Sequence, residues 1–95
     1  MLEKTIEAWL RDRIRMLGGE MYKFVSPGNA GVPDRICVLP NGSTLFIELK
    51  TDTGRLSAIQ KVQIKKLQKM NARVEVVYGM GGAKKFMKEI EEELK

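Results

Sequence analysis

Two short apolar runs separated by a turn sequence constrain the fold of this chain more than any other feature. Ile36–Leu39 and Leu45–Ile47 carry apolar residues at consecutive positions. A strand that is apolar on both faces must be covered on both sides, so these runs predict two inner strands of a sheet packed between helices. Pro40-Asn41-Gly42 between them is typical of a turn and predicts an antiparallel hairpin.

The rest of the chain completes an α/β pattern. The expected elements are a helix over residues 2–17, strands over 20–25, 34–39 and 44–50, a helix over 57–71, a strand over 73–78 and a helix that ends near Leu94. Ser57-Ala-Ile-Gln60 predicts a capping box at the start of the second helix. Strands 44–50 and 73–78 flank that helix, so they should lie parallel. Gly79–Gly82 is expected to turn the chain.

Composition limits the possible chemistry. The chain has 95 residues, which predicts one domain over 1–95, and no apolar run approaches the roughly 20 residues of a membrane helix. Its first residues are charged, unlike a signal peptide, so we expect a cytoplasmic protein with no membrane partner. The chain lacks histidine and has one cysteine, Cys37, which rules out His-based acid–base catalysis and an internal disulfide. A bound metal would need oxygen ligands, which favours Mg²⁺ or Mn²⁺. The net charge of +5 favours a polyanionic partner such as nucleic acid.

Three charged residues stand out on the predicted inner strands: Asp34, Glu48 and Lys50. Glu48 and Lys50 are two residues apart, so their side chains share one face. A two-residue loop of Asn41 and Gly42 would put Asp34 and Glu48 on opposite faces of the sheet. A three-residue loop starting at Pro40 would place them directly opposite each other, with Cα atoms about 4.5–5.5 Å apart. Local chemistry favours the longer loop, with a type I turn and Gly42 in the left-handed conformation.

Two carboxylates this close require a compensating cation. At about 4 Å and an effective dielectric of about 20 they repel by about 4 kcal/mol. A divalent metal between Asp34 and Glu48 would bind a phosphate and lower the pKa of a water molecule, and Lys50 would orient that water or balance transition-state charge. The structural alternative is that Asp34 caps a turn and Glu48 and Lys50 form a surface ion pair on an edge strand.

These residues carry a family resemblance. Pro33-Asp34 followed by Glu48-Leu-Lys50 resembles the PD-(D/E)XK nuclease motif. More narrowly, the chain is similar to the virus-type replication-repair nuclease (VRR-NUC) family in its stand-alone form. The residues that carry this similarity are Gly31-Val-Pro-Asp34, Phe46–Thr51, Gly54-Arg-Leu-Ser57 and Gln60. The resemblance implies an α/β fold with a PD-(D/E)XK restriction-endonuclease-like core, a mixed central sheet flanked by helices. It also implies Mg²⁺- or Mn²⁺-dependent cleavage of DNA.

The resemblance also assigns residue roles. Asp34, Glu48 and the backbone carbonyl of Leu49 would be metal ligands, and Lys50 the catalytic lysine. Gln60 matches a glutamine of the family, although the capping box explains it equally well.

The family also has a glutamate on the first helix, which would be a further metal ligand and for which Glu3 and Glu7 are both candidates. We prefer Glu3, which lies nearer the centre of the helix's apolar stripe and so should face the sheet.

The expected partner is branched or junction DNA, in repair or recombination. Cutting both strands of a junction needs two active sites, which a two-fold homodimer would supply. The residues expected to contact DNA are Lys23, Ser26, Gly31, Arg35, Arg55, Lys61 and Lys65. A non-catalytic nucleic-acid-binding module remains an alternative. A nucleotide phosphohydrolase is disfavoured, because the chain lacks a G-x-x-x-x-G-K-[ST] loop.

Overall fold

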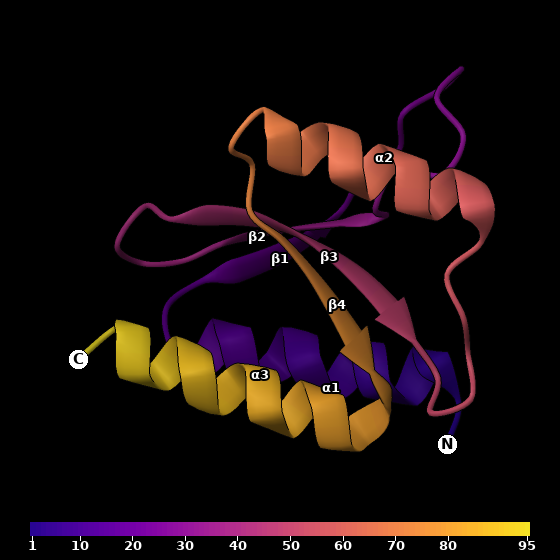
Figure 1. Ribbon diagram of the computed structural model, residues 1–95. Helices are drawn as coiled ribbons and strands as arrows, with labels where there is room; N and C mark the ends of the chain where they lie inside the picture. The colour runs from indigo at the N-terminus through magenta and orange to yellow at the C-terminus, as the bar shows by residue number, and fades with distance from the viewer.

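The computed structural model describes residues 1–95 and contains three helices and four strands (Figure 1). The elements are α1 (Glu3–Met16), β1 (Glu20–Lys23), β2 (Arg35–Val38), β3 (Thr44–Lys50), α2 (Ala58–Lys69), β4 (Val74–Tyr78) and α3 (Gly79–Glu93). This confirms the predicted order α-β-β-β-α-β-α. None of the helices is long and apolar enough to cross a membrane.

The strands form one mixed sheet in the order β1-β2-β3-β4. The pairs β1–β2 and β2–β3 are antiparallel, and β3–β4 is parallel. The two apolar runs therefore occupy the two inner strands, as predicted. Cys37 on β2 is fully buried, and burial raises the pKa of its thiol to about 11, so we expect it to be unreactive in the native protein.

The β2–β3 hairpin has the three-residue connection favoured by the sequence. Arg35 pairs with Ile47 and Cys37 with Leu45. The N–H of Gly42 donates to the carbonyl of Leu39 at 2.9 Å, and Gly42 has a φ of 88°. The predicted register and turn conformation are thus confirmed.

The main core lies between the sheet and two helices. α1 and α3 lie side by side against one face, and α2 lies over the opposite face (Figure 1). On β3 the side chains of Leu45, Ile47 and Leu49 enter this core, where they meet residues of α1 and α3 such as Ile6 and Phe86. Each such burial contributes about 1.5–3 kcal/mol to the driving force for folding.

The face beneath α2 is less completely covered. Ile64 is the only buried residue of α2, and Phe46 on β3 is half-buried. Two tyrosines of this face, Tyr22 and Tyr78, are 57% and 42% exposed. Side chains alternate along β3, so Glu48 and Lys50 project towards this partly open face, away from the main core.

The prediction of a turn over residues 79–82 is wrong, because α3 begins at Gly79. Glycine lowers helix stability by about 1 kcal/mol relative to alanine, which made a loop the local expectation. The buried side chains of Ala83, Phe86 and Ile90 outweigh that cost by packing the helix into the core. Gly79 itself has a φ of 64°, and a Cβ there would collide with the carboxylate of Asp52.

Candidate active site

The hairpin register brings Asp34 and Glu48 together. Arg35 pairs with Ile47, so the next position of the antiparallel ladder lies between Asp34 and Glu48. The backbone of Asp34 is held from the other side by Phe24, whose N–H donates to the Asp34 carbonyl at 2.8 Å. The charge of Asp34 helps to raise the pKa of Glu48, as expected for two neighbouring carboxylates.

Glu48 is almost completely buried, with 5% of its surface exposed. Its Oε2 atom lies 3.7 Å from the Nζ of Lys50 and 3.5 Å from the Nε2 of Gln60, whereas its Oε1 has no hydrogen-bond donor. Burial raises the pKa of Glu48 above its usual value, the charge of Asp34 raises it further, and Lys50 opposes both. A cation that binds this carboxylate would therefore relieve an unfavourable negative charge.

Asp34 also has one oxygen in an ion pair and one without a partner. Its Oδ2 lies 2.8 Å from the Nη1 of Arg35, while its Oδ1 is buried and accepts no hydrogen bond. Arg35 is itself largely buried and lies 3.9 Å from a carboxylate oxygen of Glu7. A buried oxygen without a donor is costly, so the position suits a ligand that supplies positive charge.

These donors fit a hard divalent cation such as Mg²⁺ or Mn²⁺. Asp34 and Glu48 each present a carboxylate oxygen with no protein partner, and the carbonyl of Leu49 is adjacent in the chain. The structure brings no three acidic, histidine or cysteine side chains close enough to form a metal site by themselves. Mg²⁺ does not need such a cage, because it commonly binds one or two carboxylates and retains several water molecules.

Gln60 makes the contacts of a capping box and also contacts Glu48. Its Oε1 accepts a hydrogen bond from the N–H of Ser57 at 2.9 Å, and its own N–H donates to the Ser57 hydroxyl at 3.2 Å, which confirms the capping box. Its amide nitrogen is directed at Glu48. The cap thereby fixes the side chain that contacts the proposed metal ligand.

The structure separates the two glutamates of α1. Glu3 has no ion-pair partner, and its charge helps to raise the pKa of Glu48. Glu7 lies 3.3 Å from Arg11 and 3.9 Å from Arg35, so its charge is already compensated. The expectation that Glu3 faces the sheet more closely is wrong, since Glu3 is exposed and Glu7 is half-buried. Glu3 stands in the first turn of α1, where little packs over it.

The residues expected to contact DNA fall into three groups. Lys23 on β1, Arg55 in the loop before α2, and Lys61 and Lys65 on α2 are exposed. Arg35 is instead paired with Asp34, so its position indicates that it orients this carboxylate.

The third group lies in the loop between β1 and β2. Ser26 accepts a hydrogen bond from Asn29 at 3.1 Å. Gly31 packs against the start of α2, where a Cβ would lie 2.8 Å from the carbonyl oxygen of Ile59. The glycine thus allows the loop that precedes Asp34 to approach the helix that carries Gln60.

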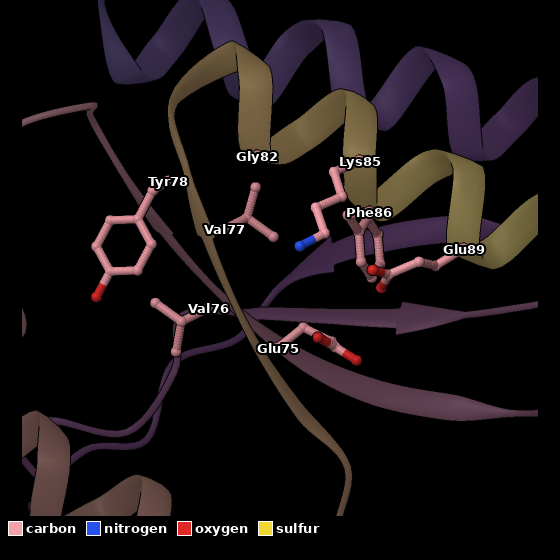
Figure 2. Close-up of a pocket in the computed structure, with 8 residues that line it drawn as sticks. All are labelled: Glu75, Val76, Val77, Tyr78, Gly82, Lys85, Phe86 and Glu89. Atoms are coloured by element: carbon pink, nitrogen blue, oxygen red, sulfur yellow. The ribbon is translucent and has the colours of Figure 1, made fainter.

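Tyr78 is a neighbour of the site that the sequence analysis missed. Val76 pairs with Glu48 and Tyr78 with Lys50 in the parallel β3–β4 ladder. Figure 2 shows Val76 and Tyr78 projecting to one side of β4, away from Phe86 on α3. Strand alternation puts Val76 and Tyr78 on the same face of β4, but only the register shows that Tyr78 lies beside Lys50.

Figure 2 draws the residues that line a groove along β4 and α3. This groove has a volume of about 310 Å³. The polar groups that line it include Glu75, Lys85 and Glu89. None of the charged residues assigned to the active site lines this groove.

Comparison with known proteins agrees with the fold and the motif. A family model described as the VRR-NUC domain matches residues 1–81. "Putative nuclease p44" of Acyrthosiphon pisum secondary endosymbiont phage 1 is 54% identical over 48 residues, a segment that spans about half of each protein, 50% of this chain and 52% of the relative. A solved structure titled "VRR_NUC domain" has a TM-score of 0.84 and 26% sequence identity, covering 90% of this chain and 94% of its own. Because the family model covers most of the sequence and the same fold recurs in that structure, this chain belongs to the VRR-NUC domain family.

Proposed function

We propose that this protein is an Mg²⁺- or Mn²⁺-dependent endonuclease that hydrolyses phosphodiester bonds in DNA. The observation that carries the proposal is the pairing of Asp34 and Glu48. Asp34 directly precedes β2 and Glu48 lies on the neighbouring β3, and each carboxylate keeps one oxygen free of protein donors. Lys50 lies 3.7 Å from Glu48. Membership of a nuclease-domain family and similarity to a relative named as a nuclease support the same activity.

Each residue has a distinct part in the proposed chemistry. Asp34 and Glu48 would hold the metal, which when bound supplies Lewis acidity towards the phosphate and lowers the pKa of water. Arg35 and Gln60 each hold one oxygen of these carboxylates and so fix their orientation. Lys50 places an ammonium group beside them, where it balances negative charge that develops on the phosphate or orients the attacking water.

Glu3 is the third carboxylate in this proposal. It carries no salt bridge and contributes to the negative potential at Glu48. Its exposed position in the first turn of α1 leaves it able to bind the metal through water. We therefore retain Glu3 rather than Glu7 as the residue of α1 that serves the site.

The proposed substrate is branched DNA, cut by a homodimer. One active site cuts one strand, and a four-way junction has two opposed strands related by approximate two-fold symmetry. A two-fold dimer would place one site on each strand. The net charge of +5 and the exposed cations near the site suit a partner recognised through its phosphates.

One cleavage assay tests the activity and its metal dependence. Purified protein is incubated with labelled four-way junction, flap, duplex and single-stranded DNA, with Mg²⁺, with Mn²⁺ and with EDTA. We expect metal-dependent cuts that EDTA abolishes, and faster cleavage of the junction than of linear duplex. Lys50→Met should reduce the rate by about 100-fold or more. Lys88→Met, which removes the same charge from an exposed position of α3, should cut normally.

The possible results separate the parts of the proposal. Binding of DNA without cleavage under any metal would identify a non-catalytic binding module. Equal cleavage of junction and duplex would contradict only the preference for branched DNA. Sedimentation that shows a monomer at micromolar concentration, both free and bound to a junction, would contradict the homodimer.

A further inference from the structure

A groove rich in arginine runs between α1 and the free edge of β1. It has a volume of about 460 Å³. Its charged lining residues are Glu7, Arg11, Arg15, Glu20, Lys23 and Arg35. Four cations against two carboxylates leave a net charge of +2 in a concave surface, where the potential is strengthened by the low-dielectric walls.

This groove adjoins the proposed active site through Arg35. Arg35 is one of its lining residues and contacts both Asp34, at 2.8 Å, and Glu7, at 3.9 Å. Positions 3, 7, 11 and 15 are one helical turn apart, so Glu3, Glu7, Arg11 and Arg15 follow one face of α1. At 1.5 Å per residue, Arg11 and Arg15 lie about 12 and 18 Å along the helix axis from Glu3. The face therefore changes from acidic near the metal ligands to basic farther away.

Arg11 and Arg15 are held in place by carboxylates but keep N–H donors for a ligand. The Nη1 of Arg11 lies 3.3 Å from both carboxylate oxygens of Glu7, and the Nε of Arg11 is buried without a hydrogen-bond partner. The Nε of Arg15 donates to Glu20 at 2.9 Å, and 53% of the Arg15 side chain is exposed. A guanidinium has five N–H donors, so one carboxylate contact leaves several for a phosphate.

Stability of the fold does not explain this arrangement by itself. Exposed ion pairs contribute only about 0–1 kcal/mol. Even with Asp34, which pairs with Arg35, three carboxylates face four cations. Lys23 has no acidic partner and is exposed on β1 at the rim of the groove. The arrangement leaves uncompensated positive charge at a fixed position beside the reacting centre.

We infer that this groove binds the sugar-phosphate backbone of the DNA that leads away from the scissile phosphate. The inference rests on the proposed nuclease function and deepens it, because it gives the path of the substrate along α1. Phosphate contacts position a nucleic acid without reading its bases, which suits recognition of DNA shape over sequence. Arg11 and Arg15 are the residues that the groove adds to the DNA contacts expected from the sequence.

A pair of matched variants on α1 tests the path. Arg15 and Arg13 are two residues apart, on opposite sides of the helix, and Arg13 lies 5.3 Å from the ring of Trp9, outside the groove. Binding to fluorescein-labelled four-way junction is measured by anisotropy in Ca²⁺ over a range of salt concentrations. Arg15→Gln should raise the Kd about tenfold and lower the slope of log K against log salt by about 1. Arg13→Gln removes the same charge and should leave the Kd and the salt slope nearly unchanged.

Two further variants keep the test decisive. Arg11→Gln combined with Arg15→Gln should lower the salt slope by about 2, and Arg15→Lys should retain most of the affinity. Circular dichroism checks that each variant is folded. Equal effects of Arg13→Gln and Arg15→Gln, or a double variant with an unchanged slope, would overturn the inference.

The outcomes also distinguish the inference from the proposed function. If the wild-type protein cuts DNA and the groove variants bind normally, only the path along α1 is wrong. If the protein never cuts DNA but the groove variants lose affinity as expected, the groove stands and the nuclease proposal falls. Failure of the wild-type protein to bind any of the DNA probes would overturn both.

Discussion

The amide of Gln60 joins the first turn of α2 to Glu48 on β3. Its oxygen accepts a hydrogen bond from the backbone of Ser57 at 2.9 Å, and its nitrogen lies 3.5 Å from Glu48 Oε2. A glutamate can replace glutamine in a capping box, but it cannot donate a hydrogen bond to a second carboxylate. The contact with Glu48 therefore requires the amide, whereas the cap does not.

Gln60→Glu should separate these two roles. The variant keeps the cap but replaces the donor beside Glu48 with a negative charge, which raises the pKa of Glu48 and repels its carboxylate from the position that the Gln60 amide holds. We expect DNA cleavage to fall by about 10–100-fold, and the acidic limb of its pH profile to move to higher pH. A Gln60→Glu variant as active as the wild type would show that Gln60 acts only as a cap. Gln60→Ala, which loses the cap as well, should also have a lower Tm.

Glu48→Gln should stabilise the metal-free protein at neutral pH. The pKa of Glu48 in the folded state is raised above the value of about 4.3 for an unfolded glutamate, so folding favours its neutral form. Ionisation above that pH costs stability, and the amide avoids the cost. In EDTA the variant should have the higher Tm at pH 7, and the difference should disappear below about pH 4.3. A change of about 1 kcal/mol in the free energy of unfolding corresponds to about 4–8 °C in the Tm of a domain of this size.

The change of Tm on adding Mg²⁺ is the matching control. A bound cation stabilises the form that binds it, so Mg²⁺ should raise the Tm of the wild type more than that of Glu48→Gln. An equal response of both proteins to Mg²⁺ would contradict a metal site at Glu48.

Gly31→Ala should damage the active site from a distance. Gly31 has a φ of 87°, and a Cβ there would lie 2.8 Å from the carbonyl oxygen of Ile59 and 3.1 Å from the backbone nitrogen of Gln60. The new methyl group would push the first turn of α2 away and move the Gln60 amide. We expect a loss of stability of about 2–4 kcal/mol, combining left-handed strain with overpacking, and reduced DNA cleavage.

Gly28 in the same loop provides the control for this variant. It has a φ of 80°, but a Cβ there would meet nothing within 4 Å. Gly28→Ala should therefore cost only the left-handed strain of about 1–2 kcal/mol and leave cleavage intact. Equal losses of activity in the two variants would show that the contact of Gly31 with α2 has no special importance.

Glu93→Gln should reduce stability at neutral pH but not in acid. Arg73, just before β4, makes two hydrogen bonds of 2.8 and 2.6 Å to Glu93 at the end of α3, and they lower the pKa of Glu93. The pair therefore contributes stability above the unfolded pKa of about 4.3, and this contribution is lost as the pH falls through the lower pKa of the folded state. We expect a cost of about 0.5–1 kcal/mol at pH 7, because the pair is partly exposed.

Glu92→Gln is the matched control on the next residue. Glu92 pairs with Lys95 at 3.0 Å, but both side chains are more than 70% exposed. Thermal melts at pH 7 should show no significant change for Glu92→Gln. A loss equal to that of Glu93→Gln would indicate a general effect of charge at the end of α3 instead of the contact with Arg73.

The elements and hairpin register of this protein were predictable because local rules determine them. Pro40, Asn41 and Gly42 favour one turn, and that turn fixes which residues of β2 and β3 face each other. The two-residue repeat of a strand then puts Glu48 and Lys50 on the same face. Each step depends on residues close together in the chain, and for this reason Asp34 and Glu48 could be identified as neighbours from sequence.

Only the tertiary structure decided how separate elements meet at this site. Local preference favoured a turn at Gly79–Gly82, but burial of the apolar face of α3 made it a helix. The sequence left Glu3 and Glu7 open, and the nearby cations of Arg11 and Arg35 separate them. Likewise, the position of α2 over the sheet brings Gln60 to Glu48. Such contacts join residues far apart in the chain. They depend on packing and charge compensation between folded elements, and no local sequence pattern encodes these interactions.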